Sequence, residues 1–149
     1  MALANESSNP DIIVVSLGTN DGKQTPIDTY EEAMSVATLD GLDRTKLHQS
    51  IRYALWTLRK AYPDAVCFIA TPIQRADREP LDEISSAIKK LGNRYNFIVI
   101  DAENESGIVR ENEVWLSNGH YLKDGLHPNE EGSKRIAQLY ASVILRSFA

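Results

Sequence analysis

The sequence predicts a three-layer α/β/α domain, in which a parallel sheet is covered by helices on both faces. Three apolar runs of strand length are spread along the chain, and amphipathic helical patterns lie between them. Strands that alternate with helices imply right-handed βαβ crossovers, which bring parallel strands into one sheet. A chain of 149 residues with 42% hydrophobic and 25% charged residues fits one domain spanning residues 1–149.

The first expected strand runs from Ile12 to Leu17. Its consecutive β-branched residues are typical of a strand that is covered on both faces. A short helix is expected to follow through Met34, and the spacing of Asp28 and Glu31 resembles a capping box at its start.

The next helix has an apolar stripe at helical spacing, formed by Leu47, Ile51, Ala54, Leu55, Leu58 and Tyr62. Its polar residues, His48, Arg52, Arg59 and Lys60, are expected on the solvated surface.

Two further strands and two further helices complete the pattern. The second strand, Ala65 to Thr71, contains the single cysteine, Cys67, which we expect to be buried and which excludes an internal disulfide. The third strand is Phe97 to Asp101. The helix between them has Pro80 near its start and Gly92 as its stop signal. Its inner stripe is Leu81, Ile84, Ile88 and Leu91.

The last helix is expected from about Pro128 to Arg146, with Ile136, Leu139, Tyr140, Val143 and Ile144 facing inward. Three strands are few for a domain of this type, and the run from Ile12 to Leu17 would form a bare apolar edge. We therefore expect further strands to precede this segment in the complete protein. That edge should pair with a partner chain, a swapped segment or a second copy.

Charge and hydropathy narrow the function classes. The net charge is −5, and Lys and Arg are scattered without a run longer than a pair, which argues against nucleic-acid binding. No segment is apolar for long enough to span a membrane. The first ten residues lack the basic start and apolar stretch of a signal peptide. We expect a soluble protein, and the sequence does not indicate its compartment.

A histidine and an aspartate precede the last helix, in the region where parallel sheets bind ligands. Asp124 and His127 are three residues apart, in a loop with Gly125. A carboxylate at this distance can accept the imidazole Nδ1–H and leave Nε2 as a general base. A loop aspartate and a helix-capping histidine without a catalytic role are an equal alternative.

A second polar group follows the first strand, Gly18-Thr19-Asn20-Asp21-Gly22. Gly18 allows a sharp turn, and the Asn20 side chain can donate a hydrogen bond to a developing oxyanion. Asp21 is expected to order the loop by accepting from backbone amides. By itself, this string also fits an ordinary turn.

Together and in this order, the two motifs resemble those of the SGNH hydrolases, the GDSL-type esterases and lipases. The family's G-x-N-D block matches Gly18 to Asp21, and its D-x-x-H-P block matches Asp124 to Pro128. The resemblance implies the flavodoxin-like SGNH hydrolase fold and a Ser-His-Asp triad. It makes His127 the base, Asp124 its orienting carboxylate and Asn20 an oxyanion-hole donor. Gly18 and Asp21 would support the site.

The sequence also departs from that family. The family's first block, G-D-S, carries the nucleophile, and its second block supplies a glycine amide to the oxyanion hole. Neither motif is found before Gly18. We therefore expect an incomplete N-terminus, with the serine upstream of this chain. Ser117 is retained as a substitute nucleophile, whereas Ser16 is expected within a strand.

The resemblance implies hydrolysis of a carboxylic ester or a carbohydrate O-acetyl ester, without metal or cofactor, and an inactive chain when the serine is absent. The alternative is a degenerate, non-catalytic module used for binding or assembly. A metal-dependent hydrolase is disfavoured because His48, His120 and His127 lack ligand-like spacing, and His120 is expected to line the pocket.

The sequence leaves the substrate open among acetylated carbohydrate, a short-chain ester and a lysophospholipid. Thr71-Pro72 followed by Arg75 resembles carbohydrate-directed members of the family and gives a slight preference for the first, although Arg75 also fits a surface residue.

Overall fold

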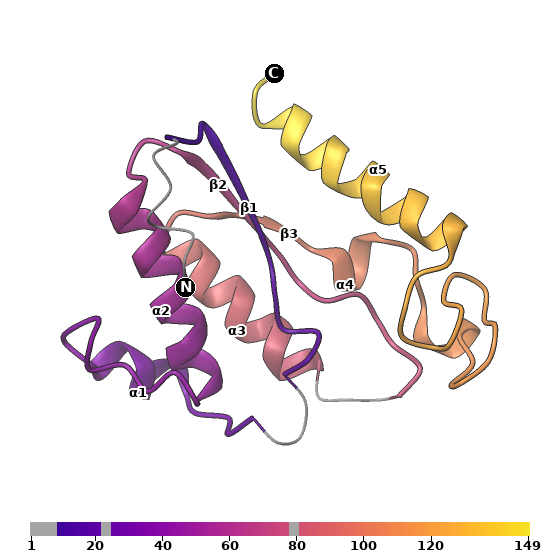
Figure 1. Cartoon of the computed structure of the whole chain (residues 1–149), viewed down its shortest axis with the longest axis horizontal. Coiled ribbons are helices and arrows are strands. Elements are labelled where there is room, and N and C mark those ends of the chain that lie inside the picture. The colour runs from indigo at the N-terminus through magenta and orange to yellow at the C-terminus, as the bar shows by residue number, and fades with distance from the viewer. Residues whose placement is uncertain (1–8, 22–24, 78–80) are drawn as a thin grey trace.

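The computed structural model describes residues 9–21, 25–77 and 81–149, and it confirms the predicted α/β fold (Figure 1). The parallel sheet has the order β1-β2-β3, and its strands are β1 (Ile12–Ser16), β2 (Val66–Ala70) and β3 (Ile98–Ile100). Ser16 pairs with Ala70, and Ala70 pairs with Ile100. The three carboxyl ends are therefore level, and the loops that follow them meet at one edge of the sheet.

Helices cover both faces of the sheet. They are α1 (Tyr30–Ser35), α2 (Leu47–Ala61), α3 (Leu81–Arg94), α4 (Ala102–Glu105) and α5 (Glu130–Arg146), with a 3-10 turn, η2, at Arg110–Asn112. The sheet passes between α2 and α3 on one side and α5 on the other, and α1 lies against α2 and α3 (Figure 1).

The main core lies between the sheet and helices α2 and α3. Leu55, Ile69 and Ile88 are fully buried there, and each such side chain contributes about 1.5–3 kcal/mol when removed from water. Cys67 is buried as expected, and burial raises the pKa of its thiol. The core under α5 is smaller, and Val143 is its one buried helix residue.

β1 is covered on one face only, which corrects the expectation of two-sided cover. Ile13 and Val15 pack toward α2 and α3. Ile12 and Val14 point to the other face and are each 43% exposed, because α5 packs over β2 and β3. Among the described residues β1 pairs with β2 alone, so its outer edge is unpaired there.

The start of α1 is shifted by one residue from the prediction. The cap is Thr29, whose hydroxyl accepts the Glu32 N–H at 3.1 Å while the Glu32 carboxylate accepts the Thr29 N–H at 2.8 Å. Asp28 has a different role, because its carboxylate accepts the backbone N–H of His48 at 2.6 Å, in the first turn of α2. Asp28 and His48 are both buried, so the expectation of a surface histidine was wrong.

Two arginines predicted on the solvated face of α2 bind main-chain carbonyls instead. Arg52 is buried and donates to the carbonyls of Ala33 and Val36. Arg59 is half-buried and donates to the Ala65 carbonyl at 2.8 Å. Carbonyls brought from other segments satisfy both guanidinium groups, which the helical pattern does not reveal.

Gly92 does not end α3, which continues to Arg94. Two residues beyond the helix, Asn96 has a positive φ of 57°. The Phe97 N–H returns to the Gly92 carbonyl at 2.8 Å, as in a Schellman motif. Pro80, the expected start signal, lies outside the described residues.

Candidate active site

The loop before α5 holds a histidine and an aspartate in direct contact. Nδ1 of His127 lies 2.7 Å from Oδ2 of Asp124. Because an ionised carboxylate only accepts hydrogen bonds, Nδ1 carries the proton, and Nε2 of a neutral ring keeps its lone pair. The His127 side chain is 61% exposed, so Nε2 has access to solvent and to a ligand.

Asp124 is held as a carboxylate by its own loop. Its Oδ1 accepts the backbone N–H of His127 at 2.7 Å and that of Leu126 at 3.0 Å. The hydrogen bonds from the backbone and the ring of His127 hold the pKa of Asp124 well below its ordinary value. The carboxylate therefore stays ionised at neutral pH and keeps the imidazole in one tautomer.

Gly125 allows this loop to close tightly. Its φ is +81°, and a Cβ there would lie 2.8 Å from the Val114 carbonyl oxygen. The loop continues directly into α5, which begins at Glu130 rather than Pro128 and is capped by the Asn129 side chain.

The other predicted loop turns sharply behind β1. Gly18 has a φ of +98°, and a Cβ there would lie 2.7 Å from Ile84 of α3. The Asp21 N–H returns to the Gly18 carbonyl at 3.1 Å, and the Asp21 carboxylate accepts the Thr25 hydroxyl at 3.4 Å. Gly22 lies outside the described residues. The turn leaves Asn20 exposed at the carboxyl edge of the sheet.

His127 and Asn20 line one cleft of about 220 Å³, although they are far apart in the sequence. The remaining lining residues come from the end of β1, the loop after β2, the loop before α5 and α5 itself: Ser16, Thr19, Thr71, Pro72, Ile73, Leu126, Pro128, Ile136 and Tyr140. Apolar side chains make up most of this wall, with a few polar groups among them, as is usual for small-molecule sites.

The sequence analysis did not identify Ser16 as a cleft residue. Ser16 was assigned to the strand interior, but it is the last residue of β1, is exposed, and accepts a hydrogen bond from the Tyr140 hydroxyl at 3.4 Å. The alternation of β1, which turns Ser16 to the same face as Val14, is the signal that could have found it.

Ser117 and His120, in contrast, do not line this cleft. Both are exposed in the loop that precedes Asp124, and the His120 ring contacts Tyr121 edge-on at 4.1 Å between ring centroids. A larger groove of about 480 Å³ lies between α3 and α4, but it holds none of the predicted site residues. Its lining is mainly charged, and it includes Lys89, Glu103 and Arg110.

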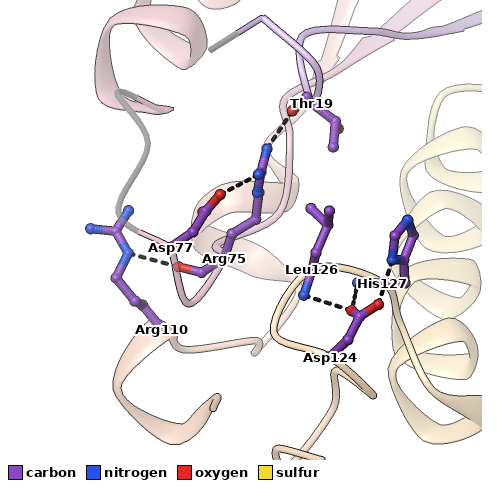
Figure 2. A network of polar contacts seen from close by, with 7 residues as sticks. All are labelled: Thr19, Arg75, Asp77, Arg110, Asp124, Leu126 and His127. Carbon is purple, nitrogen blue, oxygen red and sulfur yellow. Dashed lines mark hydrogen bonds and ion pairs between the residues drawn. The ribbon is translucent and has the colours of Figure 1, made fainter. Parts of the chain in front are cut away.

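Arg75 is neither a surface residue nor a cleft residue. Its guanidinium is buried and donates to the Thr19 carbonyl and to the Asp77 carboxylate (Figure 2). Nε of Arg110 donates to the Arg75 carbonyl at 3.0 Å. The side chain therefore lies behind the cleft wall. Arg75 is thus no evidence that the cleft binds a carbohydrate.

In the part of the chain that the structure describes, no group of three or more His, Cys, Asp or Glu side chains is arranged to hold a metal ion. No helix in that same part is long and apolar enough to cross a membrane.

Comparison with known sequences decides the family. The model of the family described as GDSL-like lipase/acylhydrolase matches residues 2–135. The chain belongs to this family. This is a family of ester hydrolases, and the chain is called the GDSL-like chain below. Among curated proteins, none matches its sequence significantly.

Solved structures share the fold of this GDSL-like chain. A possible lipase from Chitinophaga pinensis is 20% identical, with a TM-score of 0.73 over 97% of this chain and 76% of that one. A Lactobacillus plantarum protein is also 20% identical, with a TM-score of 0.74 over 92% of this chain and 67% of that one. A peptidoglycan O-acetylesterase reaches 0.64 at 20% identity, with 91% of this chain covering 37% of its length. At such identities the likeness concerns the fold.

Proposed function

We propose that this chain supplies the base, its orienting carboxylate and one oxyanion donor of a GDSL-type ester hydrolase. His127 is the general base, Asp124 holds its tautomer, and Asn20 donates to the oxyanion. The observation that carries the proposal is the shared cleft, which His127 and Asn20 both line while Asp124 engages Nδ1 of the ring.

The proposed reaction is acyl transfer from the ester to a serine and then to water. The serine oxygen attacks the ester carbonyl carbon, and its proton passes to Nε2 of His127. The tetrahedral intermediate places its negative charge beside the Asn20 amide. Its collapse breaks the ester bond, and the alkoxide leaves with the proton from His127. Water, activated by the same imidazole, then releases the acid and restores the serine.

We infer that the nucleophilic serine comes from sequence upstream of β1. Ser117 lies outside the cleft, and among the described residues the hydroxyl of Ser16 contacts the Tyr140 hydroxyl rather than the His127 ring. The outer edge of β1 and the exposed side chains of Ile12 and Val14 offer a place for one more strand. A parallel strand there would end beside the cleft.

The cleft favours a small acyl group. Its volume of about 220 Å³ and the apolar contacts of Pro72, Ile73 and Ile136 suit an acetyl or similarly short acyl chain. Because the known neighbours include a peptidoglycan O-acetylesterase, we propose an O-acetylated carbohydrate as the substrate class. A short-chain ester and a lysophospholipid are the alternatives.

The decisive experiment compares the 149-residue chain with a longer chain that includes the upstream segment. The measurement is turnover of p-nitrophenyl acetate at neutral pH. The longer chain should hydrolyse the ester, and His127→Ala should abolish that activity. The short chain should be no faster than its own His127→Ala variant. Saturable turnover by the short chain that is lost in Ser16→Ala or Ser117→Ala would place the nucleophile inside this chain.

For the 149-residue chain alone, the second proposal is a non-catalytic module used for binding or assembly. The one-sided cover of β1 favours it, because an unpaired edge with Ile12 and Val14 exposed is suited to strand pairing. Size-exclusion chromatography and amide exchange test this proposal. A monomer whose β1 amides exchange rapidly in both chain lengths would contradict pairing at this edge.

A further inference from the structure

Arg75 is a buried arginine whose side chain contacts one loop of the candidate site, and the next residue, Ala76, contacts the other loop. Its side chain is 9% exposed, and it donates to the Thr19 carbonyl and the Asp77 carboxylate (Figure 2). We propose that Arg75 is a positioning residue, which holds the Thr19–Asn20 peptide in the orientation needed for oxyanion binding, on a segment that Ala76 attaches to the His127 loop. This inference rests on the function proposed above for Asn20 and His127.

The first link is the peptide unit between Thr19 and Asn20. A peptide is planar and trans, so an arginine that grips the Thr19 carbonyl also fixes the plane that carries the Asn20 nitrogen and Cα. The residue before this peptide is Gly18, whose backbone has the widest conformational freedom. A bond from outside the turn is therefore the effective way to hold Asn20 in one position.

The direction of approach separates Arg75 from the substrate. Thr19 and Asn20 both line the cleft, whereas Arg75 does not. The guanidinium reaches the turn from behind the cleft wall and touches the carbonyl rather than the ligand. Arg75 thus acts through Asn20 and is not a catalytic residue itself.

The second link joins the same segment to the loop of the histidine. The residue after Arg75, Ala76, donates its N–H to the Gly125 carbonyl at 2.9 Å. Gly125 lies between Asp124 and Leu126, and the Leu126 N–H donates to the Asp124 carboxylate. One short segment therefore contacts the Asn20 turn through the Arg75 side chain, as Figure 2 shows, and the His127 loop through the backbone of Ala76.

Stability alone is a poor explanation for this buried ion pair. Nε of Arg75 and Oδ1 of Asp77 are buried without a hydrogen-bond partner among the described residues. Buried pairs of this kind often stabilise a protein no better than apolar side chains of the same volume, and unsatisfied buried atoms are destabilising. The geometry that the pair imposes on Thr19 accounts for it better.

The test is a double-mutant cycle in the longer chain that includes the upstream segment, here called the complete enzyme. The substrate is p-nitrophenyl acetate. Asn20→Ala should lower kcat by about 10²–10³-fold, as expected for a lost oxyanion donor. Arg75→Met should lower kcat by about 10–100-fold with KM within about twofold, because misplacement affects mainly the transition state. In the Asn20→Ala background, Arg75→Met should cost less than about threefold, because its effect passes through Asn20.

Arg52 provides the matched control. It is another buried arginine that donates to main-chain carbonyls, those of Ala33 and Val36, and like Arg75 it does not line the cleft, but it contacts neither loop of the site. Arg52→Met should lower the thermal unfolding temperature and leave kcat unchanged in both backgrounds. An equal loss of kcat from Arg75→Met in both backgrounds would overturn the positioning role.

A second set of variants covers the case in which Arg75→Met does not fold. Arg75→Lys keeps the charge but cannot serve both partners with one planar group, so it should retain the fold and still lose kcat. Added methylguanidine should restore part of the activity of Arg75→Ala. Full activity in Arg75→Lys, or no rescue in a folded Arg75→Ala, would count against the proposal.

Failure of this inference can be told apart from failure of the proposed function. If Asn20→Ala leaves kcat unchanged, the oxyanion role of Asn20 is wrong. The positioning role is then tested by NMR in the 149-residue chain, where Arg75→Lys should shift and broaden the Asn20 amide signals more than Arg52→Lys does. Unchanged Asn20 signals would overturn the positioning role by themselves.

Discussion

In the described part of the chain, two histidine–aspartate pairs differ in exposure and in hydrogen bonding. In the pair of His127 and Asp124, Nδ1 and Oδ2 are 2.7 Å apart, and the side chains are 61% and 38% exposed. In the pair of His48 and Asp28, Nδ1 and Oδ1 are 3.4 Å apart, and the side chains are 11% and 2% exposed. The first pair lies in the cleft at the carboxyl edge of the sheet, and the second at the start of α2.

The difference lies in what each carboxylate binds. Asp124 accepts the imidazole N–H as well as the backbone, so it controls the tautomer of the ring. Asp28 accepts the backbone N–H of His48 at 2.6 Å, while Nδ1 of that ring and Oδ2 of Asp28 have no hydrogen-bond partner among the described residues. Asp28 therefore caps a helix. The same two residue types make a proton-transfer pair only where the ring is both oriented and accessible.

The largest expected effect separates the two histidines by activity. In the complete enzyme, His127→Ala should lower kcat for p-nitrophenyl acetate by about 10⁴-fold or more, because the general base is lost. His48→Ala should leave kcat unchanged and should lower the unfolding temperature, because a buried ring is replaced by a cavity. Steady-state kinetics and thermal unfolding of both variants measure this. Comparable loss of kcat in the two variants would remove the distinction.

A smaller effect is expected for the carboxylate that orients the active ring. Asp124→Asn should lower kcat by about 10²–10⁴-fold, because an amide NH₂ can stabilise the wrong tautomer of His127. Asp28→Asn keeps an acceptor oxygen for the His48 N–H and should leave kcat unchanged. Kinetic measurements on the two variants, both checked for folding by circular dichroism, form the test. A fully active Asp124→Asn enzyme would show that orientation by this residue is dispensable.

The third prediction concerns the free energy of unfolding, for which the buried pair of Asp28 and His48 should matter more than the exposed pair of Asp124 and His127. Asp28→Ala should reduce the free energy of unfolding by about 1–3 kcal/mol, because it leaves the His48 N–H without an acceptor in a buried site. Asp28→Asn is the matched control and should cost less. Urea denaturation gives both values. If Asp28→Ala unfolds at the same urea concentration as wild type, Asp28 contributes little as a cap.

The smallest expected effect is a change with pH in the free energy of unfolding, which arises from the pair of Asp124 and His127. The pKa of Asp124 is lower in the folded chain than its ordinary value of 3.8. The carboxylate therefore contributes stability that is present above the unfolded pKa and is lost as the pH falls through the folded pKa. Asp124→Asn should be less stable than wild type near neutral pH, and the difference should shrink below about pH 4. Because the side chain is partly exposed, the change is small. A constant difference in urea denaturation from pH 6 to pH 2 would contradict it.

Local patterns determined much of this protein. Apolar runs of strand length located all three strands, and apolar residues at helical spacing located α2, α3 and α5, because secondary structure follows from side-chain periodicity. Topology then brought Asn20 and His127 into one cleft, as expected for loops that follow the carboxyl ends of parallel strands. The contact between Asp124 and His127 was also predictable, because it spans three residues of one loop.

Only the tertiary structure decided which polar side chains are buried and which groups they bind. Arg52 and Arg75 look like surface residues in the sequence, yet both are buried on main-chain carbonyls from distant segments. The one-sided cover of β1 could not be predicted from the sequence either, since it depends on where α5 crosses the sheet. A periodic pattern marks the apolar face of an element, but it carries no record of which carbonyls or helices the rest of the chain brings to the other face.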